Sequence, residues 1–296
     1  MIPRVANLVK LKADYQHYID ELKTTAFKGD IEDRYEARLL CATDNSVYQL
    51  LPSGVIFPKD EADVQIALKL STKDCYKDIV FAPRGGGTGT NGQSLTMGIL
   101  IDSSRYMKEI IKLDVDKCEV TVQTGVIKDE LNDFIKEHNL FFSPELSTSN
   151  RATIGGMISN DAAGQGSNVY GRTSDHIKSL SIILNDGTKA HFGPVSGKEL
   201  QECLKQDGFV GDIYRQCYTL LKGCKSRVKE VFPKLNRFMT GYDLDHAYDD
   251  TTDTLNLARL VCGAEGTLGF VTDVTLDLTK VPSYRGLLIV VSIGIV

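Results

Sequence analysis

The feature that most limits the fold of this chain is a glycine-rich segment, residues 83–94, which holds five glycines. Strand-like residues precede it at Ile79–Phe81 and follow it at Gly98–Asp102, so the sequence predicts a strand–loop–strand unit. Glycines let the backbone curve and bring successive N–H groups close to one ligand. Consecutive inward amides form a nest suited to a pyrophosphate, and a plain turn rarely needs so many glycines. The segment therefore predicts a ligand that carries phosphate.

Two familiar phosphate-binding motifs compete for this segment. Gly87, Gly89 and Gly92 match the dinucleotide fingerprint of a Rossmann domain, which needs a helix directly after the loop. Here residues 93–98 lead into a strand instead, which speaks against a nicotinamide-dependent Rossmann dehydrogenase but leaves it as an alternative. A P-loop is excluded because no Gly-Lys-Ser or Gly-Lys-Thr ends the motif.

Two later segments share this glycine-rich character. Residues 144–166 are small and polar but are anchored by Ile154, Met157 and Ile158, which suits backbone lying against a flat ligand. Residues 262–271 place Glu265 among three glycines. Each segment alone is compatible with ordinary loop structure, but the ordered triple is much more specific.

Together, the three segments resemble the FAD-binding domain of the vanillyl-alcohol-oxidase/PCMH family of flavoproteins. The resemblance implies an α+β fold of two subdomains with FAD between them. It also implies non-covalent FAD, because no histidine lies in 83–94, where some relatives attach the flavin. The FAD-binding residues that it implies are Arg84, Gly85, Gly86, Gly87, Thr88, Gly89, Thr90, Asn91, Ser94, Pro144, Ser147, Thr153, Gly155, Gly156, Asn160, Ala162, Gly164, Glu265, Gly266 and Val271.

Residues 43–50, 144–151 and 232–243 are similar to one branch of this family, the large bacterial FAD-linked dehydrogenases of D-2-hydroxy acids. This resemblance implies hydride transfer from the substrate Cα to flavin N5, with D-2-hydroxyglutarate as the first candidate substrate and D-lactate as the second. In that branch, a cap domain carries most substrate contacts, and an iron–sulphur relay further along the chain takes the electrons. A flavin-binding module without turnover of its own is an alternative for these residues in isolation.

The chain departs from the family pattern within residues 160–164. Asp161 and Ala163 stand where the family has asparagine and glycine, which leaves the side-chain contacts of Asp161 open. No catalytic residue is assigned. The histidines are isolated, without metal-ligand spacing, so we expect no metal site.

The sequence predicts three parts: a helical extension over 1–47, the FAD-binding domain over 48–280, and the start of a cap or a tail over 281–296. Helices are expected over 8–25, 31–41, 62–70 (capped by Asp60), 126–138 and, in pieces, 198–232. Further strands are expected over 55–57, 110–113, 119–123 and 269–278. Residues 180–192 read as a hairpin with a type I′ turn at Asn185–Gly187.

Composition limits the partners and the location. With 34 basic and 39 acidic residues, the chain has no bulk positive charge for nucleic acid, and we expect no nucleic-acid partner. Its seven cysteines form no Cys-x-x-Cys pair, which favours a reducing compartment. The longest apolar run, Leu287–Val296, is about half the length of a spanning helix. We therefore expect no transmembrane segment and a cytoplasmic location, with a peripheral position at the inner membrane face as the alternative.

Overall fold

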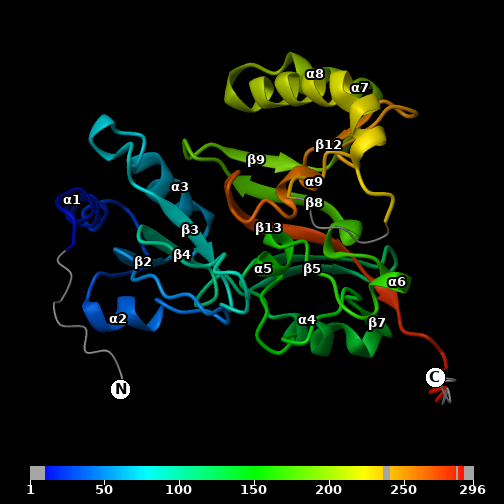
Figure 1. Cartoon of the computed structure of the whole chain (residues 1–296), viewed down its shortest axis with the longest axis horizontal. Coiled ribbons are helices and arrows are strands. Elements are labelled where there is room, and N and C mark those ends of the chain that lie inside the picture. The colour runs from blue at the N-terminus through cyan, green and yellow to red at the C-terminus, as the bar shows by residue number, and fades with distance from the viewer. Residues whose placement is uncertain (1–10, 236–240, 285, 290–296) are drawn as a thin grey trace, which may run out of the picture.

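The computed structural model describes residues 11–235, 241–284 and 286–289, and it consists of two halves that meet along one seam (Figure 1). The first half, blue to cyan in Figure 1, contains a sheet of order β1-β2-β4-β3. Its strands are β1 (Asp30–Glu32), β2 (Gly54–Phe57), β3 (Phe81–Arg84) and β4 (Ile99–Asp102). β2, β4 and β3 run parallel, while β1 is antiparallel to β2. Helices α1 (Ala13–Leu22), α2 (Tyr35–Leu40) and α3 (Glu61–Leu70) belong to this half.

The second half is built on an antiparallel sheet of order β5-β6-β13-β8-β9. Its strands are β5 (Ile110–Asp114), β6 (Glu119–Gln123), β8 (Ile177–Ile183), β9 (Lys189–Phe192) and β13 (Phe270–Asp277). Around it lie α4 (Lys128–Ile135), α5 (Ile154–Ser159), α6 (Ser167–Tyr170), α7 (Gly197–Lys205), α8 (Gly208–Val231) and α9 (Ala258–Val261). Small sheets are formed by β10 (Pro194–Val195), β11 (Tyr248–Asp249) and β12 (Thr254–Asn256), and by β7 (Leu140–Phe141) and β14 (Thr279–Lys280).

Each half has its own hydrophobic core. Apolar side chains of the five-stranded sheet alternate toward α4 and α5, as in β13, where every second residue is buried. The other core packs α1 and α3 against the parallel sheet, with Tyr18 fully buried and its hydroxyl donating to the carbonyl of Ala67 at 2.7 Å. Ile183 and Phe270 of the second half also belong to this core, so apolar contact joins the halves.

Most of the expected elements are confirmed, including the strand–loop–strand unit of β3, the glycine loop and β4, although β3 covers Phe81–Arg84 and not the expected Ile79–Phe81. Asp60 caps α3, as expected, by accepting from the N–H of Asp63 at 3.0 Å. The predicted extension, domain and tail boundaries stay predictions, and the C-terminal apolar run lies mostly outside the described residues.

Two local expectations are wrong. A helix beginning at Ile31 is not found, because Ile31 pairs with Ile56 in the sheet and the helix begins at Tyr35. The type I′ turn is also wrong: it requires positive φ at both central residues, whereas only Gly187 has one, at +82°. The turn is instead closed by the Gly187 N–H donating to the carbonyl of Leu184 at 2.9 Å. A distant strand therefore decided the conformation at Ile31, whereas the turn differs only in where its one positive-φ residue lies.

Candidate functional site

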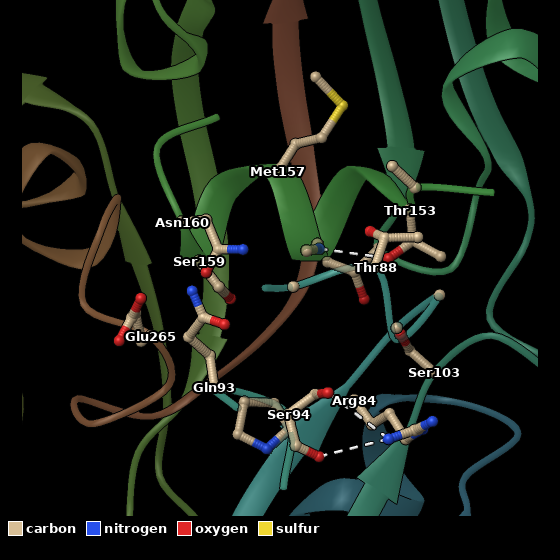
Figure 2. Close-up of a pocket in the computed structure, with 18 of the residues that line it drawn as sticks. Arg84, Thr88, Gln93, Ser94, Ser103, Thr153, Met157, Ser159, Asn160 and Glu265 are labelled. Atoms are coloured by element: carbon tan, nitrogen blue, oxygen red, sulfur yellow. Dashed lines mark hydrogen bonds between the residues drawn. The ribbon is translucent and has the colours of Figure 1, made fainter. Parts of the chain in front are cut away.

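A groove lies where the two halves meet, and the three glycine-rich segments form its walls (Figure 2). The loop after β3 forms one wall, and the region around α5 forms another. Glu265 and residues 269–271, at the start of β13, complete it. Figure 2 shows Gln93 of the loop, Asn160 at the end of α5 and Glu265 around the same space. The tertiary structure therefore brings together segments that lie far apart in the sequence.

The glycine loop presents unused backbone donors to the groove. Within the described part of the chain, the N–H groups of residues 85–89 donate no hydrogen bond. All five of these residues line the groove. Because a peptide N–H without a partner favours an anion or another acceptor, the loop is suited to binding such a group.

Glycine is required in this loop for packing as well as for ligand approach. A Cβ on Gly85 would lie 2.0 Å from Oγ1 of Thr153, and one on Gly86 would lie 2.1 Å from the carbonyl oxygen of Arg151. Thr153 is the N-cap of α5, where its Oγ1 accepts from the N–H of Gly156 at 3.2 Å. The first and second glycine-rich segments therefore touch backbone to backbone, which explains two of the glycines.

Arg84 anchors the loop instead of reaching into open space. Its Nη2 donates to the carbonyl of Thr43 at 2.8 Å, and its Nε lies 4.0 Å from the carboxylate of Asp102. The Arg84 guanidinium thus ties the loop to the segment before β2. Its charge contributes to the groove wall, but its donors are largely used within the protein.

Glu265 is held at the groove by backbone contacts to the end of α5. Its N–H donates to the carbonyl of Ser159, and the N–H of Gly263 donates to the carbonyl of Ile158, both at 2.9 Å. The backbone of Glu265 is left-handed, with φ of +51°, which is uncommon for a residue with a side chain. This conformation places the carboxylate in the lining of the groove.

The structure brings most of the expected site residues to this groove. Those that line it are Arg84, Gly85, Gly86, Gly87, Thr88, Gly89, Ser94, Thr153, Gly155, Gly156, Asn160, Ala162, Glu265 and Val271. Those that do not line it are Thr90, Asn91, Pro144, Ser147, Gly164 and Gly266. Gly266 lines a neighbouring apolar cavity of about 510 Å³. The role of every one of these residues in FAD binding stays a prediction.

Some lining residues were not predicted: two lie outside the glycine-rich segments, two look like core residues, and two are polar residues inside the segments that the family resemblance did not single out. They include Gln93, Ser103, Thr124, Met157, Ser159 and Phe270. Ser103 and Thr124 directly follow β4 and β6, and only the meeting of the two sheets brings these strand ends to one groove. A polar residue at a strand end was the one local signal available.

Comparison with known proteins identifies this region. Residues 52–193 match a family model described as FAD binding domain. These residues belong to the FAD binding domain family. The chain is 46% identical over 285 residues to D-2-hydroxyglutarate dehydrogenase of Pantoea ananatis and 45% identical over 288 residues to that of Escherichia coli. These alignments cover 96% and 97% of this chain but only 28% of each relative, so the chain spans just over a quarter of their length.

A solved structure supports the fold. An alkyldihydroxyacetonephosphate synthase is similar with a TM-score of 0.65 at 16% identity, covering 94% of this chain and 42% of that one. The expected two-subdomain FAD-binding fold is confirmed. The Rossmann alternative is wrong, because the strand β4, and not a helix, follows the glycine loop.

The residues of the FAD-binding domain fit the cofactor. The free amides of residues 85–89 suit its pyrophosphate. The Oγ1 atom of Thr124 is buried, has no hydrogen-bond partner among the described residues and belongs to a groove-lining residue. A buried hydroxyl without a partner is costly, and a polar cofactor in the groove would supply one. The glycine loop and Thr124 therefore both offer hydrogen-bonding groups that suit FAD.

We expect Glu265→Ala to weaken FAD binding by about tenfold, because the variant removes an acceptor from the groove and puts alanine on a left-handed backbone. Fluorescence titration with FAD measures the affinity. Glu265→Asn is the control for the backbone, since asparagine tolerates that conformation. Unchanged affinity in both variants would show that Glu265 is only a turn residue.

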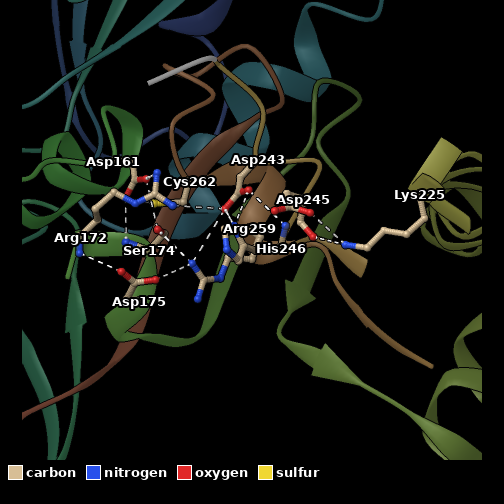
Figure 3. Close-up of polar contacts among 10 residues, drawn as sticks. All are labelled: Asp161, Arg172, Ser174, Asp175, Lys225, Asp243, Asp245, His246, Arg259 and Cys262. Carbon is tan, nitrogen blue, oxygen red and sulfur yellow. Dashed lines mark hydrogen bonds and ion pairs between the residues drawn. The ribbon is translucent and has the colours of Figure 1, made fainter. Parts of the chain in front are cut away.

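A cluster of charged residues lies behind the wall formed by residues 160–162 (Figure 3). Arg172 pairs with Asp161 at 3.0 Å and lies 3.6 Å from Asp243, while Arg259 pairs with Asp175 at 2.9 Å. Arg172, Asp161 and Asp243 are almost completely buried. Removing one member of a buried ion pair leaves its partner charged and dehydrated, which is costly.

His246 is the pH-sensitive member of this cluster. Its Nδ1 lies 2.8 Å from Asp243, and this hydrogen bond raises the pKa of His246 above the ordinary value of 6.5, while desolvation opposes the rise. A histidine whose pKa is higher in the folded than in the unfolded state stabilises the fold fully at pH values below its unfolded-state pKa. This stabilisation is lost as the pH rises through the folded-state pKa. Wild type should therefore exceed His246→Asn in free energy of unfolding below about pH 6.5, and the difference should vanish at alkaline pH.

The size of this effect is limited by solvent. The His246 side chain is 47% exposed, so we expect a difference below about 1 kcal/mol. Urea denaturation at several pH values measures it. A difference that grows with rising pH would contradict the assignment.

Proposed function

We propose that this chain is the FAD-holding portion of a flavin-dependent D-2-hydroxyacid dehydrogenase. The observation that carries the proposal is the cradle of free amides at residues 85–89, which faces the α5 wall and Glu265. The names of the Pantoea and Escherichia relatives support the substrate class, with D-2-hydroxyglutarate first. D-lactate is the second candidate.

The chemistry is the oxidation of a secondary alcohol. Bound FAD would supply the acceptor for the hydride that leaves the hydroxyl-bearing carbon, while the hydroxyl proton passes to a base and a 2-oxo acid forms. The amides of residues 85–89 would hold the pyrophosphate, and the hydroxyl of Thr124 and the carboxylate of Glu265 would bind other polar atoms of the cofactor. The described lining of the groove contains no histidine, so we propose that the base lies outside these residues.

Electrons would leave through an iron–sulphur relay outside this chain. Within the described residues, no helix combines the length and apolar character needed to span a bilayer. We propose a cytoplasmic location, with peripheral attachment to the inner membrane face as the alternative.

The visible absorption spectrum of the purified chain tests the FAD assignment. Flavin bands that move to the supernatant after acid precipitation would support non-covalent FAD. A colourless chain that takes up no FAD on titration would overturn the proposal.

A flavin-binding module without turnover is the second candidate. It is favoured by the shortage of charged groups in the groove, where Arg84 and Glu265 are the ionisable residues in the described lining. A dehydrogenase assay with a dye acceptor, on this chain and on a full-length relative, separates the two. Activity in the relative alone would identify this chain as the cofactor half.

A further inference from the structure

Asp161 lies within the groove wall but points away from the groove. Its neighbours Asn160 and Ala162 line the groove, whereas the Asp161 side chain enters the charged cluster (Figure 3). Its backbone is left-handed, with φ of +46°. Asparagine and aspartate tolerate this conformation better than other residues with side chains, but it still has to be held by contacts.

The carboxylate of Asp161 has partners on both oxygens. Oδ1 accepts from the N–H of Ser174 at 2.9 Å, and Oδ2 accepts from the Ser174 hydroxyl at 3.2 Å and pairs with Arg172 at 3.0 Å. The thiol of Cys262 lies 3.6 Å from Oδ1. Burial raises the pKa of Cys262, so the sulphur keeps its proton and acts as a donor. Every contact on the carboxylate is therefore attractive.

A second connection joins the same two segments one residue further on. The carbonyl of Ala162 accepts from the N–H of Thr173 at 3.1 Å and from the Thr173 hydroxyl at 2.7 Å. The wall segment 160–162 is thus bound at consecutive residues to segment 172–174. Because Arg172 also lies 3.6 Å from Asp243, the wall is connected to the loop that follows residue 240.

We propose that Asp161 is a positioning residue that holds segment 160–162 in the conformation that binds FAD. It acts through Ser174 and Arg172 and does not touch the cofactor. The inference rests on the proposed function, because it concerns how this chain retains FAD. Loss of the carboxylate would free the left-handed turn and move the backbone of Asn160 and Ala162 out of the groove wall.

Asp161→Gly is the decisive variant. Glycine accepts positive φ without strain. The variant therefore removes the contacts of the carboxylate with Ser174 and Arg172 but still allows the left-handed backbone. We expect the FAD dissociation constant to rise about tenfold or more. Asp161→Asn keeps an oxygen for the N–H of Ser174 and the same backbone tolerance, and Arg172 still has the carboxylate of Asp243 at 3.6 Å, so we expect affinity within about threefold of wild type.

Asp253→Gly is the matched control. Asp253 also has a left-handed backbone, with φ of +50°, and its carboxylate accepts from Tyr218 and Tyr248, outside the groove. It tests whether removing a hydrogen-bonded aspartate from such a turn is enough to weaken binding. We expect wild-type affinity, measured by FAD fluorescence titration alongside the melting temperature of each apoprotein.

The outcomes separate the two proposals. Wild-type affinity in Asp161→Gly, equal loss in Asp253→Gly, or failure of Asp161→Asn to retain FAD would each overturn the positioning role while the FAD assignment stands. Failure of the wild-type chain to bind FAD would overturn the proposed function and this inference with it.

Discussion

A Gly89→Val variant is expected to lose FAD affinity by more than about 100-fold, which corresponds to about 2.7 kcal/mol of binding free energy. Gly89 lines the groove within the run of free amides, so a branched side chain there would occupy the space that the pyrophosphate needs. The fold should survive, because a Cβ on Gly89 would meet only the flexible end of Gln93, at 2.6 Å from Oε1. Fluorescence titration measures the affinity, and circular dichroism checks the fold.

Other glycines of the loop would give a less clear result. A Cβ on Gly86 collides with the backbone of Arg151, so valine at that position would disturb the packing between the segments as well as the cofactor site. Gly223 of α8 provides the matched control, since nothing lies within 4 Å of an added Cβ there. Gly223→Val should bind FAD like wild type. A folded Gly89→Val protein with normal flavin content would disprove the assignment of the loop.

The second expected result is that the FAD-loaded chain is not reduced by D-2-hydroxyglutarate. A dicarboxylate substrate needs cations that hold it, and a base within hydrogen-bond reach of its hydroxyl. Arg84 is the cation in the described lining of the groove, and its guanidinium already donates to Thr43 and faces Asp102. Nor do the described residues contain a group of three or more potential metal ligands.

An anaerobic visible spectrum tests this expectation. The flavin band should persist after D-2-hydroxyglutarate or D-lactate is added, and dithionite should then bleach it, which shows that the bound flavin is reducible. Bleaching by either hydroxy acid alone would mean that the groove already contains a complete active site. In that case the substrate anchors would have to be sought within this chain.

Asp161, which stands where the family has asparagine, shows how far a role can be predicted from the sequence. The replacement of asparagine by aspartate was visible, but its meaning was not, because the partner Arg172 is supplied by a different segment. The spacing of the cysteines likewise predicted no role for Cys262, whereas the structure places its thiol 3.6 Å from the same carboxylate. Contacts of this kind depend on distances that a linear pattern does not contain.

Some features of the fold depend only on residues close together in the sequence, and these could be predicted from the sequence alone. The glycine loop between β3 and β4, the cap at Asp60 and the alternation in β13 are all set by neighbours within a few residues, so the sequence alone determined them. For the same reason the glycine loop predicted a ligand that carries phosphate, whereas FAD was implied by the family resemblance of the three segments. Glycine where backbone approaches backbone or phosphate is a local requirement with few substitutes.

The tertiary structure decided those features that require contact between segments far apart in the sequence. Ile31 joined a strand because Ile56 was available to pair with it, and Thr124 became a groove residue because the end of β6 faces the start of α5. The charged cluster behind Asp161 likewise draws on four separate segments, one of which is helix α9. Such contacts gain their free energy only after the chain has closed long loops and excluded water, so no local pattern specifies them.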